Sequence, residues 1–235
     1  MEKFDKLKLE RSVAKVTRTT LIMKAVGITA AGLVVIIAVT YIFSIFMDYS
    51  GNFTVRLASN PGSLSLSETN DFRVMTERLT ARPLPGANNI SVNDLPSDLD
   101  DYDGDHSTRN YLAFTFYLKN TGDMPCTYNA QINISEVTQN VDDAVRIRVY
   151  YNGEFKDYAK PKKDNSGPEP NTAQFYSQNI AYNMTRPEFK PGEVDKFTVV
   201  MWLEGDDPDC TDELIGGVFK AEMVIRIVKR DQQLV

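Results

Sequence analysis

The chain has 235 residues, a formal net charge of −6 and only two cysteines. This length allows one membrane segment and one globular domain. The charge is uneven, because residues 1–24 carry seven Lys/Arg and three Asp/Glu, a net +4, which leaves −10 for the remainder. Such an acidic remainder argues against nucleic acid as a partner.

The N-terminal part of the chain predicts a membrane anchor. Residues 1–20 form a basic tail, which either lies as a short helix on the inner membrane surface or stays a simple charged tail. The apolar run at 25–47 has no charge in 23 residues. As a helix it reaches about 34 Å, enough to cross a hydrocarbon core of about 30 Å. We therefore expect a transmembrane segment at 21–47.

The orientation of this anchor follows from its flanking charges. Positive residues stay in the cytoplasm, so the N-terminus should be cytoplasmic and 48–235 should form an extracellular domain. The alternative is a cleavable signal peptide, which has a shorter apolar region and a small-x-small cleavage site. The sequence FSIFMDYSG after the run offers no such site. A single-pass protein of the cell membrane with an uncleaved signal anchor is therefore the prediction.

After residue 48 the hydrophobic period becomes two, which is typical of half-buried strands in an antiparallel sheet. Turn sequences separate the strands: Asn152-Gly153 predicts a tight hairpin and Pro191-Gly192 a type II turn. Because no sequence pattern after residue 48 predicts a long helix, we expect an all-β sandwich of seven to nine strands, with jelly-roll or immunoglobulin-like topology. The clearest strands are expected at 111–120, 126–134, 145–151, 195–203 and 218–228, and weaker ones at NFTVRLA and SLSLS.

The two cysteines are both expected outside the membrane, where thiols are oxidised. Cys126 and Cys210 each lie beside a proline-containing turn. We predict a disulfide between them, which by chain-entropy estimates would stabilise the fold by about 4 kcal/mol.

Residues 204–213, named here the acidic turn, carry six carboxylates in ten residues. Asp and Pro suit a turn, and Asp209 to Asp212 look like a capped helical turn that stops at the following glycines. A solvated turn is one interpretation. The other is a Ca²⁺ site, since this ion takes oxygen ligands. Its candidate ligands are Asp206, Asp207, Asp209 and Asp212.

A second acidic run, DLDDYDGDHS at 98–107, offers Asp101, Asp103 and Asp105 as further candidate ligands for Ca²⁺. It departs from the EF-hand loop, because its first position is Leu99 and its twelfth is Asn110. A solvated loop is the competing interpretation.

No catalytic residues are predicted. His106 is the only histidine, whereas zinc proteases need two or three imidazoles. The chain also lacks HExxH, GxSxG and a phosphate-binding glycine loop. We therefore expect a protein that is not an enzyme and needs no cofactor other than possible Ca²⁺.

The stretches Lys119-Asn-Thr-Gly-Asp123, Lys190-Pro-Gly-Glu193 and Phe197-Thr-Val199 follow an N-terminal membrane segment. This combination resembles the camelysin-like and TasA-like surface proteins of Gram-positive bacteria. The resemblance covers residues 111–228 and implies a jelly-roll protein of the cell surface or biofilm matrix. Some members of these families form fibres. Camelysin-type protease activity does not carry over, because no matching metal-binding histidines are present. The charged cytoplasmic tail and the expected uncleaved anchor also depart from the pattern.

The sequence thus predicts a membrane-anchored structural or adhesion protein of the bacterial surface, or a subunit of a cell-envelope assembly. Its partners would be other envelope or surface proteins, including copies of itself, besides the membrane bound through 21–47. Two alternatives stay open: a Ca²⁺- or ligand-binding extracellular module, and an accessory subunit of a membrane protein complex.

Overall fold

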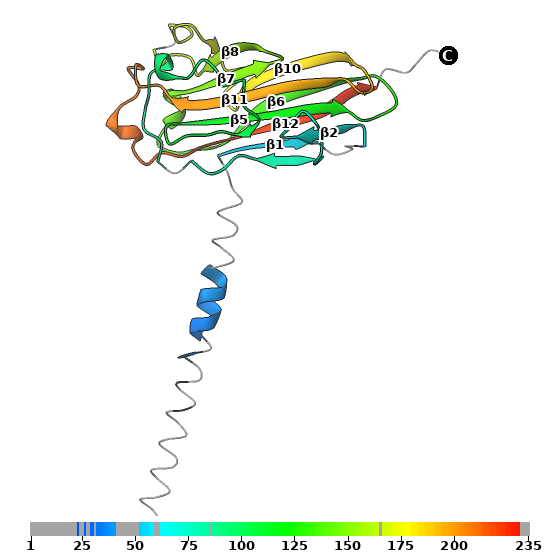
Figure 1. Cartoon of the computed structure of the whole chain (residues 1–235). Coiled ribbons are helices and arrows are strands. Elements are labelled where there is room, and N and C mark those ends of the chain that lie inside the picture. The colour runs from blue at the N-terminus through cyan, green and yellow to red at the C-terminus, as the bar shows by residue number, and fades with distance from the viewer. Residues whose placement is uncertain are drawn as a thin grey trace, which may run out of the picture. The chain divides into compact units, whose positions relative to one another are not determined.

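Beyond residue 50, the residues described by the computed structural model form twelve strands and three short 3₁₀ helices, joined by loops (Figure 1). The described residues are 23, 26, 29–30, 32–40, 52–58, 62–84, 86–164 and 166–230. The chain divides into two units, Met1–Tyr49 and Ser50–Val235. The elements of the second unit are β1 (Phe53–Leu57), β2 (Leu64–Ser67), β3 (Arg78–Thr80), η1 (Val92–Asp94), β4 (Gly104–Asp105), β5 (Tyr111–Asn120), β6 (Cys126–Val137), η2 (Val141–Asp143), β7 (Val145–Tyr151), β8 (Glu154–Ala159), β9 (Ala173–Gln174), β10 (Ile180–Phe189), β11 (Val194–Leu203), η3 (Asp212–Leu214) and β12 (Phe219–Arg230).

In the first unit, the described residues between 23 and 40 are α-helical. The described part of the chain contains no helix that is both long and apolar enough to span a bilayer. The tail predicted at 1–20, and much of the anchor predicted at 21–47, lie outside the described residues.

The second unit is a sandwich of two sheets, which confirms the all-β prediction. One sheet has the strand order β10-β6-β12-β1-β3, and the other has β2-β5-β11-β7-β8-β9, with β4 also paired to β5. Most neighbours are antiparallel, but β1 runs parallel to β12. The twelve strands exceed the seven to nine expected because β3, β4 and β9 have only two or three residues each.

The alternating residues of the long strands fill the space between the sheets. In β5, Leu112, Phe114, Phe116 and Leu118 are all at most 1% exposed, as their spacing predicts. Phe114 meets Phe53 of the opposite sheet edge to face, with ring centroids 6.3 Å apart. These contacts form one continuous core, the main source of stability.

The predicted turns are confirmed. Asn152 and Gly153 have φ of +51° and +89°, the left-handed values that a type I′ hairpin needs, and they connect β7 to β8. Gly192, with φ of +81°, precedes β11 and fits the third position of a type II turn.

Two of the stretches behind the family resemblance lie side by side. The Asn120 N–H donates to the Glu193 carbonyl at 3.1 Å, and the Gly192 N–H donates to the Asn120 carbonyl at 2.8 Å. The Asn120 side chain is 1% exposed and its Nδ2 donates to the Phe189 carbonyl at 2.7 Å. A Cβ on Gly122 would lie 2.9 Å from the Cβ of Ser63, so the turn after Asn120 requires glycine. Together these bonds fasten the β5–β6 turn to the β10–β11 turn.

Candidate functional site

The acidic turn follows the end of β11 and holds other segments through its carboxylates. Glu204 is 6% exposed and accepts from Trp202 Nε1 at 2.9 Å and from the Val92 N–H at 3.1 Å. Asp206 accepts from Ser91 Oγ at 2.6 Å. These bonds attach the end of β11 to η1, so this part of the turn acts as a clamp between segments distant in sequence.

The four predicted Ca²⁺ ligands of the acidic turn do not converge. Asp206 is bound to Ser91, and Asp212 belongs to η3, where its side chain is exposed. Asp207 and Asp209 do come together, and they are joined by Glu169 from the β8–β9 segment. The structure therefore brings together two of the four predicted residues and adds Glu169, for which no sequence pattern pointed to a ligand.

Arg146 lies at the centre of this group, which we call the Arg146 cluster: Arg146, Glu169, Asp207 and Asp209. Arg146 Nη2 forms an ion pair with Asp207 Oδ2 and lies 3.6 Å from Glu169 Oε2. The side chains of Arg146, Glu169 and Asp207 are at most 5% exposed. One ligand oxygen from each of the three carboxylates lies within 4.8 Å of the others.

Two lysines of the β8–β9 segment extend the cluster. Lys160 Nζ lies 2.7 Å from Asp143 and 2.9 Å from Asp142. Lys163 Nζ lies 3.0 Å from Asp143 and 3.7 Å from Asp209. Burial acts to raise the pKa of Asp143, but its bonds to Lys160 and Lys163 outweigh this effect, so the pKa lies below its ordinary value. The ion pairs fasten the β8–β9 segment to η2 and to the acidic turn.

Glu169 has the opposite environment. Burial and the neighbouring Asp207 raise its pKa above the ordinary value of 4.5. Its carboxylate has no hydrogen bond to any residue of the described chain, and Arg146 at 3.6 Å is its ion-pair partner. Chemically, the cluster can store buried charge, take up a proton at Glu169, or bind a cation that competes with Arg146.

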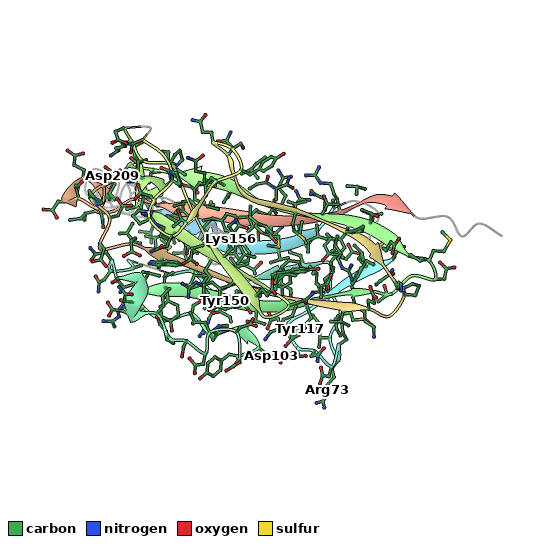
Figure 2. The ribbon with its side chains drawn as sticks, turned by 90° about the horizontal axis from the view of Figure 1, so that it is seen from above. Arg73, Asp103, Tyr117, Tyr150, Lys156 and Asp209 are labelled. Atoms are coloured by element: carbon green, nitrogen blue, oxygen red, sulfur yellow. The ribbon has the colours of Figure 1, made fainter. Side chains whose placement is uncertain are left out.

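The second acidic run does not bring its three candidate ligands together either. Asp103 Oδ1 accepts from the Tyr117 hydroxyl at 2.5 Å (Figure 2). Asp105 accepts from the backbone N–H groups of Arg82, at 2.5 Å, and Ser107, at 3.0 Å. Asp101 is exposed. The three carboxylates thus have separate hydrogen-bonding roles or face solvent, and none of them belongs to the group of converging carboxylates found among the described residues.

This run instead closes the outer face of the β5–β11 sheet. Leu99, 1% exposed, packs in a small cluster with Ala113, Tyr150, Val200 and Trp202. Next to it, Thr198 Oγ1 donates to Asp100 Oδ1 at 2.6 Å. The hydrogen bond of Asp100 therefore helps to keep the apolar side chain of Leu99 packed on the sheet.

His106 belongs to the same loop. Its Nδ1 lies 3.0 Å from the Gly104 carbonyl, and its ring centroid lies 5.6 Å from that of Tyr102. Its Nε2 is buried and is the one such side-chain atom in the described chain without a hydrogen-bond partner. With Nδ1 facing a carbonyl, the ring helps to shape the loop.

The predicted Cys126–Cys210 disulfide is wrong, since no bond joins the two sulfurs. Cys126 lies 3.9 Å from the side chain of Asn120, where β5 ends. Cys210 follows β11, whose Trp202 pairs with Tyr111, where β5 begins. β5 has ten residues and, at a rise of about 3.3 Å per residue, is about 30 Å long. A disulfide needs Cα atoms about 4–7 Å apart. Two cysteines that lie near opposite ends of β5 are therefore too far apart to be bridged.

A cleft that the sequence did not predict opens at the end of the sandwich where β1 begins. We call it the end cleft; its volume is about 770 Å³. Asn52 and Phe219 line it from one sheet, and Leu112 and Met201 from the other. Figure 1 shows the segment that follows β11, in orange, at the opposite end of the sandwich from the end of β12. This segment supplies Cys210 and residues 211–218 to the lining.

Comparisons with known proteins identify no family. No family model matches the chain, and no curated protein matches it. Among solved structures, the N-terminal domain of PorA is similar over 70% of this chain and 96% of its own, with 7% identity and a TM-score of 0.26. A GH31 α-xylosidase from Xanthomonas citri covers 71% of this chain and 18% of its own, with 11% identity and a TM-score of 0.27. Similarity this low carries no argument about function.

Proposed function

We propose that this chain is a membrane-anchored, single-pass surface protein whose β-sandwich serves as a structural or adhesion subunit of a cell-envelope assembly. The basic segment before a long apolar run supports the anchor and its orientation, with the acidic sandwich outside. Its partners would be other surface proteins or further copies of itself. The proposal assigns no catalytic residue.

One structural observation carries the assembly role: the open edge of β10. β10 has ten residues and ends the first sheet, where β6 is its only partner strand among the described residues. The strands that end the sheets elsewhere, β2, β3 and β9, have four, three and two residues. An unpaired row of backbone groups on a long strand is a template for a strand of another chain. β10 is therefore the surface best suited to self-association or to a partner strand.

The strand order supports a jelly roll rather than an immunoglobulin-like sandwich. From β5 onward, the connections β5–β6, β6–β7, β9–β10, β10–β11 and β11–β12 all pass between the two sheets, whereas β7, β8 and β9 follow one another within one sheet. The result is two sheets of interleaved strands, as in the Greek keys of a jelly roll. The predicted resemblance to TasA-like surface proteins implies the same topology.

A single lysine on the edge strand tests the proposal. Thr185 of β10 is exposed, and Thr185→Lys should block strand addition, since edge lysines oppose pairing with another chain. We expect particles of full-length protein in mild detergent to become smaller on size-exclusion chromatography with light scattering. Ser135→Lys, an exposed position on the neighbouring β6, is the control and should leave particle size unchanged. Equal sizes for wild type and Thr185→Lys would contradict the role of β10.

Ca²⁺ binding is the second candidate function, favoured by the convergence of Glu169, Asp207 and Asp209. If the ion enters, it must compete with Arg146, so a millimolar affinity typical of extracellular modules is expected, with a Kd of about 10⁻⁴–10⁻³ M. Isothermal titration calorimetry should show binding to the wild type that Asp209→Asn weakens at least tenfold. Asp212→Asn is the control, because Asp212 lies outside the group. Absence of heat, together with an unchanged melting temperature in Ca²⁺, would contradict this candidate.

A further inference from the structure

The end cleft has walls from both sheets and an apolar interior. Its lining includes Leu84, Val145, Leu203, Leu214 and Phe219. Most of these side chains are largely buried, but Ile215 at the mouth is 73% exposed. A volume of about 770 Å³ falls within the range of about 300–1,000 Å³ that is usual for ligand sites. The cleft therefore has room for a few apolar side chains at the open end of the core.

One side of the mouth offers backbone hydrogen-bonding groups. Gly86, Ala87, Asn88 and Asn89 line the cleft, and none of their backbone N–H groups donates to a described residue. The next residue, Ile90, returns to the sheet and donates its N–H to the Leu203 carbonyl at 3.0 Å. An extended chain that lay along 86–89 would provide acceptors for these donors, as in strand addition.

The charge around the mouth restricts the occupant. The lining contains no Lys or Arg, and its one charged residue is Asp212. Asp212 is followed by Glu213, and both side chains are exposed. Arg82 and Arg109 line a neighbouring pocket that shares Leu84, Gly86 and Asn88 with the cleft, so the acidic side of the mouth is the side at Asp212. On this side an acidic amphiphile, such as a fatty acid, would be repelled, and a basic group beside the apolar part would be attracted.

We propose that the end cleft binds an extended peptide segment of a partner protein, in which apolar side chains lie next to a basic residue. The apolar side chains enter between the sheets, the peptide backbone pairs with 86–89, and the basic residue faces Asp212. This site is distinct from the edge of β10, and it stands whether or not the assembly role at that edge is correct.

The single tryptophan makes the proposal measurable, because Trp202 lines the cleft. The probe is the peptide acetyl-Lys-Thr-Ile-Thr-Leu-Lys-amide, titrated into the full-length protein in mild detergent. We expect a saturable change in tryptophan emission. The peptide should also slow the alkylation of Cys210 by iodoacetamide, since this residue lines the same cleft. Alkylation at Cys210 is read by mass spectrometry and is distinguished from the 1% exposed Cys126.

Two altered peptides test the two recognition elements. A twin with Glu in place of both Lys should bind at least about fivefold more weakly, because it faces Asp212 with like charge. A twin with N-methyl groups and ester linkages on alternate residues should lose binding, because its backbone cannot pair with 86–89. Equal affinity of either twin and the parent peptide would overturn the proposal.

A charge reversal in the protein completes the test. Asp212→Lys should weaken binding of the parent peptide at least about fivefold and should strengthen binding of the twin that carries Glu. Asp123→Lys is the matched control, because it changes the net charge by the same amount. Asp123 is an exposed residue of the β5–β6 turn, at the end of the sandwich away from the end cleft. The control should alter affinity by less than about twofold. Equal effects of the two variants would overturn the proposal by showing mere attraction to an acidic protein. Saturable binding of cyclohexanol without any peptide binding would also overturn it and make the cleft a small-molecule site.

Discussion

Replacing Arg146 with methionine is expected to destabilise the sandwich by about 3–5 kcal/mol, because it leaves two buried carboxylates without their cation. Glu169 and Asp207 share Arg146, and all three side chains are at most 5% exposed. Methionine keeps most of the volume, so the loss reports the missing charge. Urea unfolding followed by the emission of Trp202 measures the change, and the midpoint should fall with an unchanged slope.

Two comparisons isolate this effect. Adding Glu169→Gln and Asp207→Asn to Arg146→Met should recover most of the lost stability, because no unpaired charge then stays buried. Arg56→Met removes a more exposed pair, in which the side chains of Arg56 and Glu222 are 41% and 25% exposed, and should cost less than about 1 kcal/mol. A loss of the same size in Arg56→Met would contradict the central place of Arg146.

The loss in Arg146→Met should also shrink as the pH falls. Burial and Asp207 raise the pKa of Glu169 in the folded protein already with Arg146 present. Without Arg146 the pKa rises further, since an opposing charge is lost. A carboxyl whose pKa is higher in the folded state takes up its proton there first, so stability increases as the pH falls from the folded pKa towards the ordinary value. A gap between variant and wild type that stays constant from pH 7 to pH 4 would contradict this assignment.

Asp195→Ala should cost about 3 kcal/mol or more, since it removes a buried acceptor of several charged hydrogen bonds. Asp195 of β11 is 3% exposed and accepts from Tyr128 at 2.5 Å, Tyr151 at 3.2 Å and Asn152 at 2.9 Å. Tyr128 belongs to β6 in the other sheet and is fully buried. The variant removes the carboxylate acceptor of this hydroxyl inside the core. Urea unfolding again gives the measurement.

Tyr128→Phe is the matched partner for this experiment. It removes the same bond between the sheets from the other side but leaves no unpaired hydroxyl in the core, and Asp195 keeps Tyr151 and Asn152. We expect a loss of about 1.5–3 kcal/mol, smaller than that of Asp195→Ala. The double variant should lose less stability than the sum of the two single losses, because both substitutions remove the same Tyr128–Asp195 hydrogen bond. Full additivity would show that the two residues act independently.

The sandwich could be predicted because its strands alternate with the period of a sheet. Leu112 to Leu118 illustrate this, since every second residue faces the core. β10 was missed because Arg186 and Pro187 interrupt its pattern, and its register shifts between Arg186 and Phe189. Proline is tolerated there because β10 lies at an edge, where no further strand needs its N–H.

The candidate site was less accessible to sequence reasoning because its partners are distant along the chain. Arg146 stands in a strand at a position that alternation assigns to solvent, yet it is 4% exposed. The acidic turn and the β8–β9 segment cover it, and neither contact has a sequence pattern. The cysteines show the same limit, since suitable turns around Cys126 and Cys210 carry no information about which end of the sandwich each one occupies.

Native extraction tests the central claim most directly. The full chain is extracted from its own membranes in mild detergent, sized, and analysed by mass spectrometry with whatever travels with it. An assembly subunit should be recovered from the membrane fraction in a large, defined particle that contains several copies or other surface proteins. The Thr185→Lys variant should yield a smaller one. A lone monomer, or recovery from the soluble fraction, would contradict the account of an anchored assembly subunit.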